Sequence, residues 1–475
     1  MKKYLNRIAF LVLLTALAAC KISKNIETPN AALPENFRNA AVDSTAKNDT
    51  ASVADLPINS FFTDASLQKL LASAISKNYD MQIALKNIEA SQLLFKQTKW
   101  AYFPDAKLQI SAGSNRPSDN SLNGLSASSF LKTTHIEDFT TSVGLSWEAD
   151  IWGKIRNKNG RALAEYLQTI EAKNAIQTNL VATVSQGFYN LLMLDSQLAI
   201  AEKNLALNDS TLTIFGFQYT AGQVTSLAIQ QAEAQKLAAA KLIPELEQNI
   251  TIQENALSIL VGELPGRTER SLKLDEVKFP ETLSAGVPTA ILNRRPDIRR
   301  SELALDIANA NVGIAKANMY PALTITASGG INSFKASNWF NIPASLFGAA
   351  AGGITQPLFQ RNQLKTQYEV SKIDRERTVI EFRQSVLYAV GEVSDALVKI
   401  EKLKEQQRIA ALRVKTLEQA ISNSNMLFQS GMANYLEVIT AQSNVLQSEL
   451  ELVAIKRAQL SANVDLYRSL GGGWK

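Results

Sequence analysis

Histidine, the side chain most often used for acid–base catalysis near neutral pH, occurs only once in the chain, as His135. A single imidazole cannot supply a cluster of histidine metal ligands, and the surrounding Ser/Thr-rich sequence offers no context for a serine–histidine–aspartate triad. The sequence also lacks a glycine-rich loop with the spacing that cradles nucleotide phosphates. We therefore predict that the protein is not an enzyme, with no cofactor and no metal site, and that His135 is an exposed loop residue.

Cysteine also occurs once, and its position indicates export. A basic N-terminus leads into a short apolar run at residues 8–14, the pattern of a signal peptide. The following Leu17-Ala18-Ala19-Cys20 resembles a bacterial lipobox, in which the cysteine becomes the acylated first residue of the mature chain. We predict a lipoprotein signal peptide over residues 1–19 and lipidation at Cys20, with an ordinary signal peptide and an incidental cysteine as the alternative. Lys21, in place of an aspartate, favours the outer membrane as destination.

The charge balance argues against nucleic acid as a partner. The formal net charge is +5, and removal of the signal peptide with its three basic residues leaves +2 without any basic tract.

With one cysteine, no intrachain disulfide can form. No run of about 18 apolar residues follows the signal, so the sequence predicts no transmembrane helix, and any membrane crossing would have to use strands.

The elements that would position functional residues come in two similar halves. Residues 80–104 and 297–321 both run from an aspartate at a helix start to a proline that precedes a strand-like stretch. Gly222 and Gly431, which both interrupt long helical patterns, lie 209 positions apart. This period of roughly 210 residues is far longer than a solenoid repeat, and it indicates one large duplicated module.

Apolar periodicity predicts long helices and short strands in both halves. Seams such as the one through Leu180, Val184 and Leu191 indicate helices packed lengthwise. Helices of about 65 residues would span roughly 95–100 Å at 1.5 Å per residue. Each half is therefore expected to be a long antiparallel coiled hairpin, with strands at one end and a glycine turn at the other. The expected helices cover about 65–77, 80–101, 153–218, 225–261, 297–318, 362–427 and 434–469, with strands near 322–330 and 346–357 and two counterparts after Pro104.

The four expected strands cannot cross a membrane within one chain. Each has about 8–12 residues, the length of a tilted membrane-spanning strand. The smallest transmembrane barrels have eight strands, and an open sheet leaves unpaired edge groups in lipid, so several copies must join. The expected organisation is a signal peptide at 1–19, an extended lipidated segment at 20–60, a first repeat at 61–263, a linker or equatorial segment at 264–288 and a second repeat at 289–471.

Two motifs resemble those of one family. The stretch Asn293-Arg294-Arg295-Pro296-Asp297-Ile298-Arg299-Arg300, followed by Tyr320-Pro321, looks like the hallmark of TolC-type outer-membrane efflux lipoproteins of the NodT branch. Ser146-Trp147-Glu148-Ala149-Asp150-Ile151-Trp152-Gly153-Lys154 is similar to that family's junction between second strand and helix. The resemblance covers nearly the whole chain, from about Phe61 to Gly471. It implies a mainly α fold with a small β part: a homotrimer with a 12-helix periplasmic tunnel and a 12-stranded transmembrane β-barrel.

The function implied by this resemblance is the outer-membrane exit duct of a tripartite efflux pump, which exports small molecules passively after an adaptor opens the helical tip. Its partners would be a periplasmic adaptor protein, an inner-membrane resistance–nodulation–division transporter and outer-membrane lipid, with no nucleic acid. A type I secretion duct with the same fold is an alternative. A periplasmic adaptor, which would have one hairpin flanked by compact β domains, is less favoured.

In the resembling family the glycine turns form the closed periplasmic tip and the adaptor contact. The residues assigned to this contact are Gly222, Gln223, Val224, Thr225, Gly431, Met432, Ala433 and Asn434. Three copies of Glu437 would form an acidic constriction of the bore, with a solvated surface residue as the alternative. The first repeat has Ala228 at the equivalent position, so such a ring would come from the second hairpin alone. The arginines at 294, 295, 299 and 300 are expected to pair with carboxylates and to be structural.

Overall fold

The computed structural model describes residues 33–34, 37–38, 52–279 and 285–475. It separates into two compact units, and both halves of the chain contribute to each of them. The strand unit contains Glu89–Leu167 and Glu302–Ile380, and the hairpin unit contains the described residues up to Ile88 together with Gln168–Ser301 and Glu381–Lys475. The predicted signal peptide and Cys20 lie outside the described residues.

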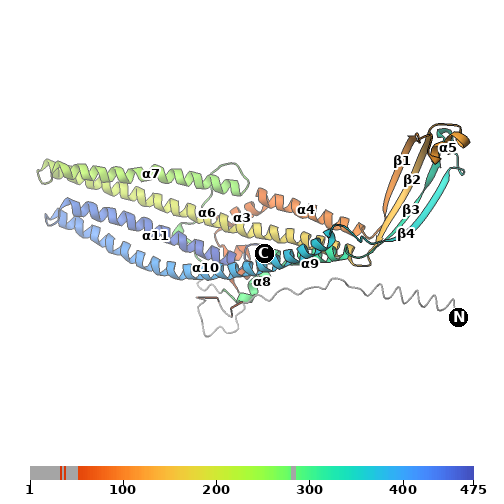
Figure 1. Ribbon diagram of the computed structural model, residues 1–475. Helices are drawn as coiled ribbons and strands as arrows, with labels where there is room; N and C mark the ends of the chain where they lie inside the picture. The colour runs from red at the N-terminus through yellow and green to blue at the C-terminus, as the bar shows by residue number, and fades with distance from the viewer. Residues whose placement is uncertain (1–32, 35–36, 39–51, 280–284) are drawn as a thin grey trace. The chain divides into compact units, whose positions relative to one another are not determined.

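The strand unit is built around an antiparallel sheet with the order β1-β2-β3-β4 (Figure 1). Strands β2 and β3, one from each half of the chain, pair at the centre, so β1 and β4 form the two edges. Every residue of β4 is exposed. The four predicted strands are confirmed, although β2, with 14 residues, is longer than expected. Their bounds are Asp105–Asn115 (β1), Ile136–Ala149 (β2), Ala322–Ser333 (β3) and Leu346–Thr355 (β4), and the short helix α5, Leu122–Ser126, follows β1.

The junction from β2 into the next helix shows what each side chain of its motif does. The carboxylate of Asp150 accepts hydrogen bonds from the backbone N–H groups of Ile155 (2.8 Å) and Arg156 (2.9 Å), which have no partner inside the first helical turn. The indole of Trp152 donates to the carbonyl of Pro321 at 2.7 Å and thereby ties the first half of the chain to the second. The motif therefore fixes where the helix begins.

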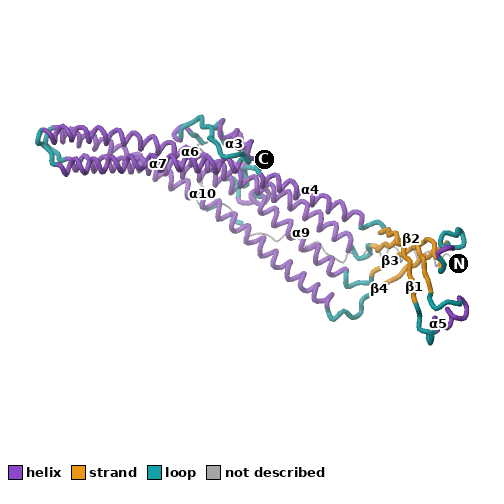
Figure 2. The backbone as a smooth tube through the Cα atoms, turned by 90° about the horizontal axis from the view of Figure 1, so that it is seen from above, coloured by secondary structure: helices purple, strands orange, loops and turns teal. Residues whose placement is uncertain are grey.

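The long helices form pairs of equal length, one from each half of the chain. Helices α6 and α10 have 67 residues each, α7 and α11 have 35 each, and α4 and α9 have 22 each. Figure 2 shows α6 and α7 side by side as an antiparallel hairpin. All predicted helices are confirmed, with ends within two residues. Their bounds are Ala65–Lys77 (α3), Tyr79–Trp100 (α4), Lys154–Thr220 (α6), Ser226–Leu260 (α7), Pro296–Ala317 (α9), Gln363–Gln429 (α10) and Tyr435–Ser469 (α11), with the short helices Ile58–Phe61 (α2) and Ile291–Arg294 (α8).

The predicted lengthwise seam of α6 is buried in the hairpin unit. Val184, Leu191 and Ala201 are all fully covered. At Gly187 the two helices approach closely, because a Cβ added there would lie 2.9 Å from Cδ2 of Leu257 on α7. Along the described residues, no helix combines the length and the apolar character needed to span a membrane.

The arginine-rich motif forms a structural ion-pair network at Arg295, as predicted. Arg295 is 6% exposed, and its guanidinium donates to both carboxylate oxygens of Asp297 (3.0 and 2.6 Å), to Glu392 (2.9 Å) and to the carbonyl of Ser469 (2.9 Å). Burial lowers the pKa of Arg295, but its bonds to the two carboxylates raise that pKa more. Burial raises the pKa of Asp297, but Arg295 lowers it more, so the net shift is downward. The network thus holds the start of α9 against α10 and the end of α11.

Candidate functional site

Each long hairpin ends in a glycine turn of the same geometry. Gly222 has a φ of +73° and Gly431 a φ of +75°, the left-handed region that favours glycine. The N–H of Gly222 donates to the carbonyl of Tyr219 (2.9 Å), and the N–H of Gln223 donates to that of Gln218 (2.8 Å). This is the Schellman pattern, which satisfies the last carbonyls of a helix, and the second turn repeats it. Both glycines therefore end helices, as predicted.

The other residues assigned to the adaptor contact differ in exposure. Val224 is half-buried and packs against an apolar cluster described below, while Ala433 is half-buried. Asn434 caps α11, because its side chain accepts from the backbone N–H groups of Leu436 (2.9 Å) and Glu437 (3.2 Å). Its counterpart Thr225 makes no such bond at the start of α7. The exposed members of the set are Gly222, Gln223, Thr225, Gly431, Met432 and Asn434.

Beside the turns, a small aromatic cluster joins the two hairpins, and we call it the tip clasp. At its centre Phe215 of α6 is 1% exposed. Its ring centroid lies 5.1 Å from that of Phe428 on α10 and 6.3 Å from that of Tyr435 on α11. Ala228 and Ala232 of α7 complete the buried part. This contact was not predicted from the sequence, although aromatic residues lie within about two helical turns of both glycines and could have indicated it.

The clasp explains why the two halves differ at one candidate position. Ala228, which is fully buried, lies against Phe215, and a larger polar side chain could not be accommodated there. Its counterpart Glu437, in the first turn of α11, is exposed. At this pair of equivalent positions, only the second hairpin carries a carboxylate.

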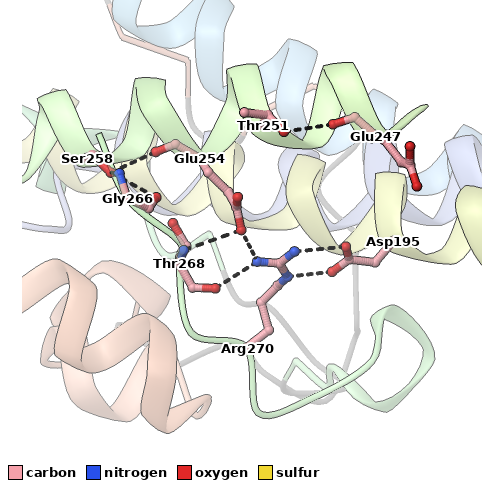
Figure 3. Close-up of polar contacts among 8 residues, drawn as sticks. All are labelled: Asp195, Glu247, Thr251, Glu254, Ser258, Gly266, Thr268 and Arg270. Carbon is pink, nitrogen blue, oxygen red and sulfur yellow. Dashed lines mark hydrogen bonds and ion pairs between the residues drawn. The ribbon is translucent and has the colours of Figure 1, made fainter. Parts of the chain in front are cut away.

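A second polar cluster fixes the segment that connects the two halves (Figure 3). Arg270 donates to both oxygens of Asp195 on α6 (2.6 and 3.0 Å) and to Glu254 on α7 and the carbonyl of Thr268 (2.5 and 2.7 Å). The Arg270 side chain is only 15% exposed. Partial burial lowers the pKa of Arg270, and the two carboxylates raise it more, so its charge is secure. We call this cluster the linker clamp, because it holds the connecting segment onto the first hairpin.

His135 is exposed, and its Nδ1 lies 3.0 Å from the hydroxyl of its neighbour Thr134. Within the described part of the chain, no three His, Cys, Asp or Glu side chains gather in a way that could hold a metal ion.

Comparison with known proteins agrees with this geometry. Residues 70–263 and 287–472, one segment from each half, match the family described as outer membrane efflux protein. The chain belongs to this family. Curated relatives include the cation efflux system protein CusC of Escherichia coli K12, 27% identical over 96% of this chain and 97% of CusC. The toluene efflux pump outer membrane protein TtgC of Pseudomonas putida is 26% identical over 96% of this chain and 93% of TtgC.

Two solved structures of membrane proteins share the fold. A membrane protein from Pseudomonas aeruginosa superimposes with a TM-score of 0.86 at 23% identity, covering 95% of this chain and all of that one. The open state of the Neisseria gonorrhoeae MtrE outer membrane channel gives a TM-score of 0.83 at 24% identity, covering 96% of this chain and 99% of MtrE. The predicted fold class, long helical hairpins with a small antiparallel sheet, is confirmed.

Proposed function

We propose that this protein is the passive outer-membrane exit duct of an efflux pump and that it works as a homotrimer of the NodT branch. The observation that carries the proposal is that both halves match the outer membrane efflux family, each with two strands and one long hairpin. The unpaired edges of β1 and β4 support joining of copies, because edge N–H and C=O groups need partners where water is absent. Three chains would contribute 12 strands to a closed barrel and 12 helices to a tunnel.

The glycine turns are the proposed contact with a periplasmic adaptor protein. Met432, which is 73% exposed, and the exposed Gln223 offer side chains for this contact at the two turns. Adaptor binding would shift the hairpins relative to one another and open the tip, while an inner-membrane transporter of the resistance–nodulation–division class supplies the energy. Glu437 is the proposed acidic constriction. Acylation at Cys20 would hold the mature N-terminus in the outer membrane.

The proposed cargo is small molecules or ions. This class follows the names of the relatives, which are a cation efflux protein and a toluene efflux protein. A type I secretion duct, which exports polypeptides, would use the same fold. A periplasmic adaptor is disfavoured, because the chain has two equivalent hairpins and four strands in repeat-related pairs.

The test combines localisation, assembly and conduction. A deletion strain should accumulate a fluorescent efflux substrate, and the native gene should restore its export. The purified protein should form trimers in detergent and conduct ions in a planar bilayer. A Cys20→Ser variant tests the anchor by membrane fractionation. A stable, non-conducting monomer that fractionates with soluble periplasmic proteins would refute the duct, and loss of a secreted polypeptide without dye accumulation would favour the secretion alternative.

A further inference from the structure

An open cavity of about 370 Å³ lies in the hairpin unit, where the start of α4 and the end of α7 meet α6. Asp80 of α4 is the one charged residue in its lining, and apolar residues such as Ile83 and Leu180 line much of the remainder. In the part of the chain that the structure describes, the Asp80 carboxylate makes no ion pair or hydrogen bond. The cavity therefore combines an unneutralised negative charge with apolar surface.

The internal repeat provides a comparison site in the second half of the chain. The starts of α4 and α9 differ by 217 positions, and the starts of α6 and α10 and of α7 and α11 both differ by 209, with equal helix lengths in each pair. These shifts assign a counterpart to each polar position of the cavity. The pairs of counterparts are Asn78 and Arg295, Asp80 and Asp297, Thr183 and Glu392, and Leu260 and Ser469.

One hydrogen bond is common to the two sites and shows that they correspond. Nη1 of Arg295 donates to the carbonyl of Ser469 at the end of α11 (2.9 Å). Nδ2 of Asn78 donates to the carbonyl of Leu260 at the end of α7, also at 2.9 Å. The first position of each site therefore binds the last turn of the same long helix.

Beyond this bond the sites differ in charge. The guanidinium of Arg295 continues to Asp297 (3.0 and 2.6 Å) and to Glu392 (2.9 Å), so the second site holds its own cation. The shorter side chain of Asn78 uses its Oδ1 to accept from the N–H of Met81 at 3.1 Å. The first site thus keeps the carboxylate, as Asp80, and lacks the guanidinium that neutralises it.

The surrounding side chains differ in polarity as well. In the second site the hydroxyls of Ser301 and Ser385 lie 3.0 Å apart and form a hydrogen bond between α9 and α10. Their counterparts in the cavity are Ala84 and Ile176, which are apolar. A ligand of the first site would therefore meet one carboxylate and several hydrocarbon side chains.

We propose that this cavity binds an organic cation with an apolar body, whose amidinium or guanidinium group pairs with Asp80 where Arg295 supplies the cation in the second half. A forked cation of this kind matches the two oxygens of a carboxylate. The C-terminal end of α7 at Leu260 adds a partial negative charge that favours a cation. The volume falls in the range of small-molecule sites, about 300–1,000 Å³. This inference goes beyond the proposed function, since it assigns a binding site and does not depend on transport.

Isothermal titration calorimetry of the purified full-length protein in detergent tests the site. The probe is benzamidinium, which has a forked cationic group on an apolar ring, and its control is benzamide, which has nearly the same shape without the charge. Benzamidinium should bind saturably, with one site per chain. Benzamide should bind at least about tenfold more weakly, because a hydrogen bond between charged groups contributes more than one between a charged and a neutral group.

Two variants locate the binding. Asp80→Asn should weaken benzamidinium binding at least about tenfold, whereas Glu233→Gln, which removes one exposed carboxylate of α7, should leave the affinity unchanged. Asn78→Arg/Thr183→Glu introduces the two side chains of the second site and should abolish binding, because the chain's own guanidinium would then occupy the cavity. Circular dichroism checks that the variants are folded, and Asp80→Asn alone decides the question if the double variant does not fold.

Three results would overturn the proposal: no saturable binding of benzamidinium, equal affinities for benzamidinium and benzamide, or equal affinities of the native chain and Asp80→Asn. None of them would bear on the duct, because trimer formation and conduction in a planar bilayer are measured without the probe. Loss of conduction with intact benzamidinium binding would refute the duct and leave the cation site standing.

Discussion

Truncation of Phe215 should loosen the tips of both hairpins at once. This side chain is the only aromatic ring of α6 in the described tip clasp, and it contacts α10 and α11 through Phe428 and Tyr435. A Phe215→Ala variant removes both ring contacts and leaves a cavity beside Ala228 and Ala232. The contacts between α6 and α11 farther from the turns, such as Gln442–Thr211 and Lys203–Glu449, are unchanged.

The size of the effect follows from the burial. Phe→Ala at a buried site costs about 3–5 kcal/mol, of which the two ring pairs account for roughly 1–3 kcal/mol. If the whole of this free energy is lost from the difference between the closed and the locally opened tip, the population of the opened tip rises about 100-fold at the lower bound, since each 1.4 kcal/mol is a factor of ten. Relaxation of the helices into the cavity reduces this value, and a rise of at least about tenfold is the expected outcome.

Limited proteolysis measures this opening. When opening is fast relative to cleavage, the cleavage rate follows the open population. Proteinase K digestion of the periplasmic side of purified outer membranes, followed by mass spectrometry of cuts near Gly222 and Gly431, should reveal the increase. Phe217→Ala is the matched control, because Phe217 lies two positions along α6 and is 72% exposed. Equal cleavage rates in the two variants would refute the role assigned to the clasp.

Four further perturbations have defined outcomes. Gly222→Val and Gly431→Val should abolish efflux in a drug-susceptibility assay while trimers persist, because the backbone must stay left-handed at both turns and β-branched residues resist that conformation. Glu437→Gln should change single-channel conductance or cation preference in a planar bilayer. Arg270→Met should lower the free energy of unfolding by up to about 3 kcal/mol, because it removes the cation that pairs with Asp195 and Glu254. The same change should raise the proteolysis rate of the connecting segment. The pKa of Asp297 is lower in the folded protein than in the unfolded chain. The ionised carboxylate therefore stabilises the fold fully at pH values above the ordinary pKa of about 3.9, and this stabilisation is lost as the pH falls through the lower pKa of the folded state.

Each of these has a contrasting result. Gly222→Asn should retain activity, since asparagine tolerates the left-handed region, and unchanged efflux in both valine variants would remove the turns from the mechanism. Identical conductance traces would leave Glu437 as an ordinary surface residue. Arg267→Met, three positions from Arg270 and exposed, should leave the proteolysis rate unchanged. An Asp297→Asn variant should lose less ellipticity than the native chain between pH 4 and pH 2, and an equal loss would assign acid sensitivity to other groups.

The sequence predicted the elements well because their signals are local. Asp64 directly precedes the first predicted helix and caps it, because its carboxylate accepts from the N–H of Leu67 at 2.8 Å. Gly222 and Gly431 were identified as helix ends for the same reason, because the left-handed conformation that ends a helix is required of a single residue and favours glycine there. The apolar seam through Val184 and Leu191 is periodic and therefore visible without any knowledge of its partner helix.

Contacts between elements could not be predicted in this way. Phe215 and Phe428 are more than 200 positions apart, and their meeting depends on the packing of two separate hairpins. The same is true of Arg270, whose partner Asp195 lies on α6 and was indistinguishable in the sequence from other carboxylates on helix faces. The repeat supplied a correspondence between positions, but it could not indicate which of two equivalent residues is covered. Only the burial of Ala228 and the exposure of Glu437 distinguish them.

This asymmetry bears on how the tip would open. The counterparts of Phe215 and Tyr435 are Ser424 and Ser226, which cannot form an aromatic contact. If neighbouring copies bring the equivalent helices together, the contact between copies would lack the aromatic cluster that joins the two hairpins of one chain near the turns. The two hairpins of one chain would then move together, and opening would separate neighbouring copies. Phe215→Ala removes the ring that joins the two hairpins of one chain. In this variant we expect the tip to open within the chain about as readily as between copies.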